Sequence, residues 1–204
     1  MLGLPKNTEL NKPLPKTAIY AKFQMSAAEK AKVDADISRI VIVNEVSAAK
    51  LNLSPGETVQ AFFVLQVVLK RKEFSEKTLI ALFRLIPQKM VLLLEHEGQA
   101  KLAVYHTKLL QTPWNDPAAL RLDIKGLTMD AVWENVVVQI GGIHMQSGNT
   151  LEQQIARDEQ RAKLEKEIAR LEKLARAENQ PKKKFELVQK IDKLKALIDE
   201  VACK

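Results

Sequence analysis

The chain has 204 residues, of which 46% are hydrophobic and 5% aromatic, a size that suits one ordinary domain with an aliphatic core and an appendage. It has no apolar run of the roughly 20 residues that cross a bilayer, and its first 16 residues, broken by three prolines, lack the apolar core of a signal peptide. The net charge of +7 suits a polyanion or an acidic partner, and the lone cysteine, Cys203, which cannot form an internal disulfide, favours a cytoplasmic location.

The first 16 residues predict an extended arm rather than a helix, because proline fixes φ and lacks a backbone donor. Lys6, Lys12 and Lys16 make this arm basic. It either packs across the domain or contacts a phosphate backbone.

Two strands and two helices are predicted next. Ser26 and Glu29 form a capping-box pattern at the start of a helix over 26–36. The β-branched run 37–47 predicts a strand, 48–53 a short helical turn, and 54–56 a tight turn. The nearly continuous apolar run 61–69 predicts a central strand that is covered on both faces. Ser75 and Thr78 then open a helix that Pro87 ends.

The rest of the first domain predicts a hairpin, an edge strand and a helix. The buried strand after Pro87 turns at Gly98 and returns over 100–110. Residues 112–119 predict a loop, and the alternating segment 120–126 an edge strand. Thr128 and Asp130 cap a helix that Gly141 and Gly142 end. Residues 1–147 therefore predict an α+β domain, a mixed sheet with about three packed helices.

Residues 148–204 predict a different structure, a coiled-coil-like antiparallel helical hairpin. Apolar residues recur at steps of four and three in two segments, with a break at 179–181. We expect this seam to bind a partner or a second copy through Leu164, Ile168, Leu171, Leu187, Ile191, Leu194 and Ile198.

A two-helix hairpin hides only one narrow seam, and this burial alone barely offsets the entropy of ordering the chain. Something else is expected to cover its second face, which Leu174, Val188 and Leu197 supply. The sequence leaves three coverings open: the α+β domain, a second copy of the chain, or another protein such as a helicase or methyltransferase.

A nucleic-acid-binding module is the alternative prediction. Phosphate contacts would come from Lys6, Lys12, Lys16, Lys70, Arg71, Lys72, Lys182, Lys183 and Lys184. Tyr105 and Trp114 would either stack on bases or lie buried. Residues 151–204 carry 14 Lys and Arg against 11 Asp and Glu, so any phosphate contact of the hairpin is expected to be local.

The sequence predicts no cofactor, no metal and no catalytic residue. The three histidines lack metal-ligand spacing, and no glycine-rich phosphate loop, GxSxG or CxxC motif is present. A divergent metal-dependent nuclease built from Glu57, Gln66 and Lys70 is a second alternative, although the spacing is wrong for a restriction-type site.

The order of features resembles one uncharacterised bacterial family, the DUF4391 type. These features are an LPK-containing arm, the segment EVSAAKLNL, the segment LFRLIPQKMVLLLE and a helical-hairpin tail. The resemblance covers nearly the whole chain. The resemblance implies genes encoded beside restriction-type or Snf2-like helicases and methyltransferases. It thus implies a non-enzymatic accessory or adaptor subunit of a DNA-acting anti-phage defence system.

Overall fold

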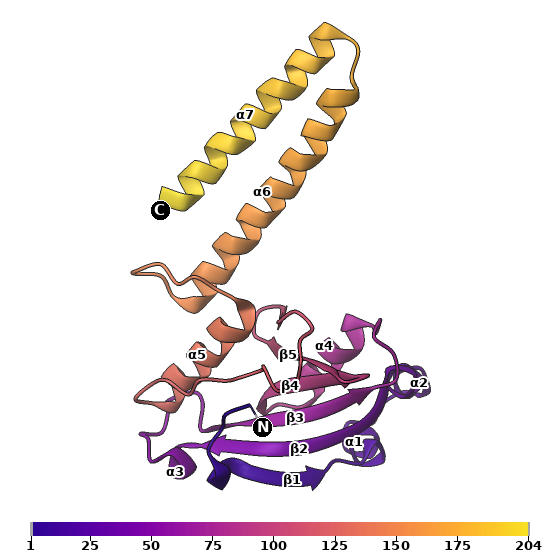
Figure 1. The fold of residues 1–204 in the computed structure, drawn as a ribbon, viewed down its shortest axis with the longest axis vertical. Coiled ribbons are helices and arrows are strands. Elements are labelled where there is room, and N and C mark those ends of the chain that lie inside the picture. The colour runs from indigo at the N-terminus through magenta and orange to yellow at the C-terminus, as the bar shows by residue number, and fades with distance from the viewer. Residues whose placement is uncertain (1, 204) are drawn as a thin grey trace. The chain divides into compact units, whose positions relative to one another are not determined.

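The computed structural model describes residues 2–203, and the side chains of residues 2–198. The chain divides into two compact units, residues 1–143 and residues 144–204. The first is an α+β domain and the second a helical hairpin (Figure 1). This confirms the predicted fold class.

The α+β domain is built on one mixed six-stranded sheet, whose strands follow one another in chain order. All neighbours pair antiparallel except β3 and β4, which run parallel. The connection between those two strands passes through helix α4, as parallel pairing requires. The strands are β1 (Glu9–Pro13), β2 (Ile37–Ser47), β3 (Ala61–Leu69), β4 (Lys89–His96), β5 (Gln99–Tyr105) and β6 (Leu109–Gln111).

Three helices cover one face of this sheet. They are α1 (Lys16–Lys22), α2 (Ala27–Asp36) and α4 (Glu76–Leu85). Ile19, Val33 and Leu79 from these helices are buried in one aliphatic cluster with residues of β2, β3, β4 and β5. The predicted capping box at the start of α2 is present, with Ser26 and Glu29 each bonding the other's backbone N–H.

Helix α5 (Met129–Gly141) packs on the opposite face. Side chains alternate along a strand, so Phe62 points away from the face that carries Phe63 and Leu65. The Phe62 ring lies 5.4 Å from that of Trp133 in α5. Thr128 caps α5 by accepting a hydrogen bond from the Ala131 N–H, and Gly142 ends it at φ 59°, as predicted.

The N-terminal segment is not simply an extended arm. It forms a 3-10 turn, η1 (Lys6–Thr8), and then the edge strand β1. Strand β1 is exposed along its length and pairs with β2 through an irregular register, with Asn11 at φ 48°. Its short length and irregularity are typical of edge strands, which they protect from further pairing.

The edge strand predicted over 120–126 is wrong. Leu120 and Leu122 are buried, as the alternation indicates, but the segment has no strand partner. The Gln139 amide takes the place of a neighbouring strand: it accepts a hydrogen bond from the Asp123 N–H and donates one to the Asp123 carbonyl. The sheet ends instead at β6, which a turn at 106–108 separates from β5.

The second unit contains two long helices, α6 (Leu151–Ala177) and α7 (Pro181–Cys203). Thr150 and Gln153 form a capping box at the start of α6. The short connection over 178–180 makes the two helices antiparallel neighbours (Figure 1). Cys203 lies in α7, but its side chain is outside the described residues.

Candidate functional site

The predicted seam of the hairpin lies between its own two helices. Ile168, Leu171, Ala175 and Ile191 are buried there, and Leu187, Leu194 and Ile198 pack against them. Leu164, earlier in α6, is half-buried. The seam side chains therefore hold α6 and α7 together within one chain.

Four large apolar side chains are exposed on the described parts of α6 and α7. Leu174 of α6 is 46% exposed, and Phe185, Val188 and Leu197 of α7 are 63%, 41% and 45% exposed. Three of them are the off-seam residues that the sequence singled out, and Phe185 adds a fourth. This group, called the outer apolar set below, is the part of the hairpin that is free to contact another molecule.

Several cations predicted to contact nucleic acid are engaged within the α+β domain. Lys16 pairs with the Asp34 carboxylate and also donates to the Ile37 carbonyl at 3.0 Å. Lys70 donates to the Asp34 carbonyl at 2.6 Å. These contacts tie the helices to the sheet and leave less of this positive charge for an external phosphate.

Asp34 is a shared acceptor in this region. Its carboxylate accepts hydrogen bonds from Lys16 and from the Tyr20 hydroxyl. The Lys16 hydrogen bond, followed by that of Tyr20, lowers the pKa of Asp34. Burial, and then the neighbouring Asp34 carboxylate, raise the pKa of Tyr20. The arrangement is a structural tether between α1 and α2.

Asp36 is the most deeply buried carboxylate of the domain, with a side chain only 2% exposed. It pairs with Arg71 and accepts hydrogen bonds from the Ser75 N–H at 3.1 Å and the Thr78 hydroxyl at 3.2 Å. Burial alone would raise the pKa of Asp36, but these hydrogen bonds, led by that of Arg71, hold it below its usual value. Asp36 thereby fixes the start of α4, where the Ser75 side chain makes no cap.

Lysines and aromatic rings meet where β5 faces the loop after β6. The Lys101 ammonium lies 4.7 Å from the Phe74 ring centroid and 5.0 Å from that of Trp114. Lys72 lies 5.9 Å from the Trp114 centroid and also donates to Gln99. Burial lowers the pKa of Lys101, and Glu76 partly opposes this. The half-buried Trp114 thus already has cations of its own chain against its ring.

Tyr105 has a similar internal role. Its ring stacks on Phe83 with centroids 6.0 Å apart, and the Arg84 guanidinium lies 5.8 Å from the Tyr105 centroid. Tyr105 and Trp114 are both half-buried, and each contacts aromatic or cationic side chains of its own domain.

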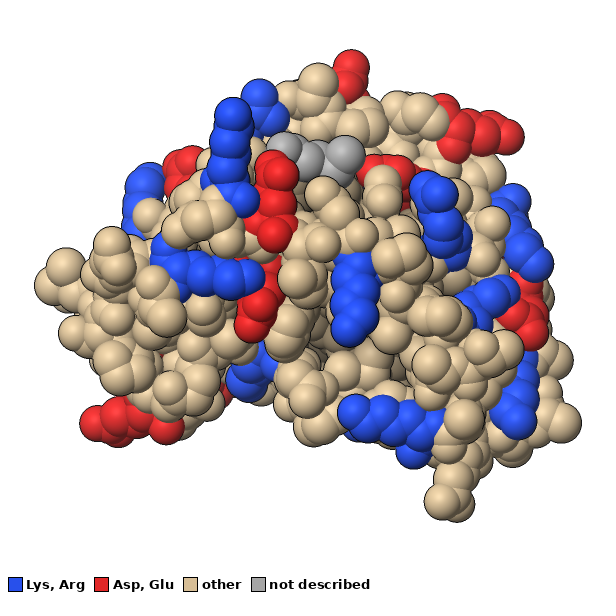
Figure 2. All heavy atoms as spheres, turned by 90° about the horizontal axis from the view of Figure 1, so that it is seen from below, with Lys and Arg blue, Asp and Glu red and all other residues tan. Residues whose placement is uncertain are grey.

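The remaining predicted cations have no described carboxylate within ion-pair distance. They are Lys6 and Lys12 in the N-terminal segment and Lys182, Lys183 and Lys184 at the start of α7, and all are exposed. Figure 2 shows one face of the molecule, on which Lys and Arg are interspersed with Asp and Glu and separated by uncharged residues. This face therefore carries no continuous basic surface.

The three residues of the nuclease alternative lie apart. Glu57 precedes β3 and Lys70 follows it, so the nine residues of this strand separate them, a span of about 30 Å. The Gln66 amide donates to Glu95 on β4 at 2.8 Å. Among the described residues, no three His, Cys, Asp or Glu side chains gather as metal ligands do.

A backbone nest in the loop before β3 is filled by the chain itself. The Asp130 carboxylate accepts hydrogen bonds from the N–H groups of Glu57 at 2.6 Å and Val59 at 2.8 Å, and from both the N–H and the hydroxyl of Thr58. The Thr58 hydroxyl is the first cause of the lowered pKa of Asp130. Asp130 was predicted to cap α5, but it occupies the place that an external anion would need.

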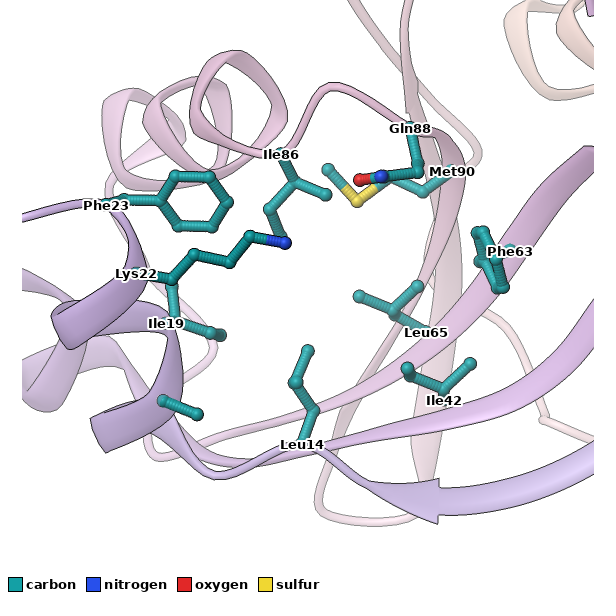
Figure 3. Close-up of a pocket in the computed structure, with 11 residues that line it drawn as sticks. Leu14, Ile19, Lys22, Phe23, Ile42, Phe63, Leu65, Ile86, Gln88 and Met90 are labelled. Atoms are coloured by element: carbon teal, nitrogen blue, oxygen red, sulfur yellow. The ribbon is translucent and has the colours of Figure 1, made fainter.

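The α+β domain contains a pocket that no sequence motif indicated. An open apolar pocket of about 270 Å³ lies between α1 and the sheet, with Lys22 and Gln88 as its polar lining residues (Figure 3). Its lining residues come from segments that are far apart in the chain. Predicting the pocket would have required the strand register, which places these residues on one face of the sheet.

Within residues 2–203, no helix combines the length and apolarity that crossing a membrane requires. Comparisons with curated proteins and with solved structures each find no match. A family model described as Domain of unknown function (DUF4391) matches residues 2–198. This match covers both the α+β domain and most of the hairpin, and the chain therefore belongs to the DUF4391 family.

Proposed function

We propose that this chain is a non-enzymatic accessory subunit of a bacterial DNA-acting defence system, and that its hairpin docks a helicase-type partner. The observation that supports this is the outer apolar set on α6 and α7. Exposed aromatic and aliphatic side chains on a helix are the usual anchors of helix-mediated docking. The kind of partner is the one that the resemblance to the DUF4391 family implies.

The two helices of the hairpin extend well beyond the seam cluster that holds them together. They span 27 and 23 residues; among the described side chains four are buried in the seam between them, and Leu151, Gln154 and Ile155 are buried at the start of α6. Helices in proteins gain most of their stability from packing an apolar face. A partner that covers Leu174, Phe185, Val188 or Leu197 would supply the second packing surface.

The test is co-purification of the chain with a helicase-type protein encoded beside its gene. Phe185→Glu and Val188→Glu together should release the partner, because both place a charge in the docking surface. Ala162→Glu is the matched control, since it adds a negative charge at an exposed position of α6 that is not on the helix face of Leu174. Retention of the partner by the double variant at wild-type yield would contradict the proposal.

Seam substitutions are a poorer test of docking. Ile191 is 5% exposed and packs within the hairpin, so a charge there would separate α6 from α7. Loss of a partner would then report unfolding of the hairpin rather than loss of a contact. The helix content of each variant, measured by circular dichroism, distinguishes the two.

Nucleic-acid binding through the hairpin tip is the second candidate function. Lys182, Lys183 and Lys184 follow Pro181 in the first turn of α7, which contains no acidic residue. Their charge adds to the positive end of the helix dipole, which favours an anion. Replacing all three by Gln should weaken binding to a short DNA duplex and reduce its salt dependence. Binding that is insensitive to salt would exclude this role.

A further inference from the structure

The pocket between α1 and the sheet has an apolar floor from three consecutive strands. Ile42 of β2, Phe63 and Leu65 of β3 and Met90 of β4 lie on the same face, as the strand register shows. In Figure 3 their side chains form one side of the cavity. Its volume of about 270 Å³ is close to the lower end of the range for small-molecule sites, roughly 300–1,000 Å³.

The pocket exists because two helices stop short of each other above the sheet. Helix α1 has only seven residues and is followed by its C-cap residue Phe23, whereas α4 is followed by its C-cap residue Ile86, before Pro87. Phe23 and Ile86 lie side by side at one edge of the opening (Figure 3). Ile42 and Phe63 are therefore left half-buried, and an apolar ligand would complete their burial.

Lys22 and Gln88 place polar groups beside this apolar floor. The Lys22 ammonium lies 5.6 Å from the Phe23 ring centroid, and no described carboxylate lies within ion-pair distance of it. Figure 3 shows the Lys22 side chain reaching over the pocket and the Gln88 amide on the opposite wall. An unneutralised cation that faces an amide donor across the opening favours an anionic head group.

We propose that this pocket binds a small aliphatic carboxylate. The alkyl chain would lie on Leu65, Met90 and Ile42, while Lys22 and Gln88 donate hydrogen bonds to the carboxylate oxygens. The charge of Lys22 opposes a cationic ligand, and a more highly charged anion would hold its second charge against an apolar wall. At ~30 Å³ for each group of water size, the cavity suits a chain of about eight carbons. This site does not depend on the hairpin or its partner.

The test is calorimetric titration of the full chain with octanoate at about pH 7.5, where a carboxylate is ionised. For a ligand of this size we expect a dissociation constant on the order of 1 mM. 1-Octanol, which has the same chain without the charge, should fill a clearly smaller fraction of the sites when both ligands are titrated to the same concentration, below the solubility limit of the alcohol. No saturable binding of octanoate up to about 10 mM would overturn the proposal.

Three variants separate the head-group contact from the chain contact. Lys22→Gln should weaken octanoate about tenfold and leave 1-octanol nearly unchanged. Ala18→Trp, at an exposed lining position of α1, should fill the pocket and weaken both ligands. Lys77→Gln, exposed on α4 and outside this pocket, is the matched control. Octanoate binding that Lys22→Gln and Ala18→Trp both leave unchanged in folded protein would overturn the site.

Discussion

Replacing Asp36 by Ala should destabilise the α+β domain by about 3 kcal/mol. The wild-type carboxylate is almost fully buried and receives hydrogen bonds from Arg71, Ser75 and Thr78. Without it, the Thr78 hydroxyl, in a residue only 4% exposed, loses its acceptor, which costs about 1–3 kcal/mol. The Ser75 N–H adds about 1 kcal/mol. Arg71, with a side chain 58% exposed, regains water and adds little.

Tryptophan fluorescence during urea unfolding measures this effect in the domain alone. The chain has two tryptophans, and both Trp114 and Trp133 lie in the unit that spans residues 1–143. The fluorescence transition therefore reports the α+β domain, whereas ellipticity at 222 nm also follows the hairpin. A fall in the urea midpoint at unchanged slope would give the loss in the free energy of unfolding.

Asp34→Ala is the matched control, because Asp34 is two residues away and also accepts hydrogen bonds from Lys16 and Tyr20. Its side chain is 49% exposed, so its removal should cost clearly less. Equal destabilisation by the two substitutions would refute the reasoning that burial of Asp36 sets the magnitude.

The same carboxylate predicts a pH dependence. The folded pKa of Asp36 is lower than its usual value, so the folded state favours the ionised form. Its contribution to stability is complete above the unfolded pKa of about 3.9 and is lost as the pH falls through the lower folded value. The urea midpoint of the wild-type domain should therefore fall more steeply with acidification in this range than that of Asp36→Ala. Parallel curves would contradict this.

Three further predictions concern other parts of the fold. Gly56→Ala should cost roughly 1–3 kcal/mol in the tryptophan-detected transition, because its Cβ would lie 2.6 Å from both Asp130 Oδ1 and the Val59 carbonyl; an unchanged midpoint would contradict it. Ile191→Ala should lower hairpin stability by about 2–3 kcal/mol, seen at 222 nm but not in tryptophan fluorescence. Gln139→Ala should increase amide hydrogen exchange at Asp123, whose N–H it leaves without its acceptor; unchanged exchange there would show that water or another group replaces the amide.

Periodic segments of the sequence predicted most of the elements. The run 61–69 is the strand β3 that joins the antiparallel and parallel parts of the sheet, and the break at 179–181 marks the end of one long helix and the start of the next. These predictions succeeded because side-chain period and breaker residues are local properties. Thr128 as a cap and Gly142 as a stop are local for the same reason.

The failures share a different cause, which is a distant partner. Residues 120–126 alternate like a strand, but the Gln139 amide satisfies the backbone of Asp123. Asp130 has the position of a helix cap, yet it binds backbone groups more than 70 residues earlier. Strand β1 gave no strand pattern in the sequence, because it is short, ends at Pro13 and pairs with β2 through an irregular register. No local pattern identifies such partners.

The sequence likewise gives the number of basic residues but does not show which of them pair with carboxylates. The net charge of +7 treats every lysine alike, whereas Lys16 and Arg71 are paired with carboxylates and Lys182 has no described carboxylate within ion-pair distance. A carboxylate that holds a lysine already neutralises the charge that a phosphate would use. Only the unpaired groups, at the N-terminal segment and at the hairpin tip, carry the electrostatic argument for nucleic acid.

In the hairpin, the residues of the heptad pattern are not the residues that are exposed to a binding partner. A heptad pattern of apolar residues predicts that a helix packs against another helix. The length of the connection that follows determines whether that other helix belongs to the same chain. Here only residues 178–180 separate α6 from α7, so each helix meets the other at high effective concentration before any other chain. Ile168, Leu171 and Ile191 are then occupied, and a second protein has access to the flanking positions alone. Among the side chains that the structure describes, apolar docking that leaves the hairpin closed would therefore use Leu174, Phe185, Val188 or Leu197.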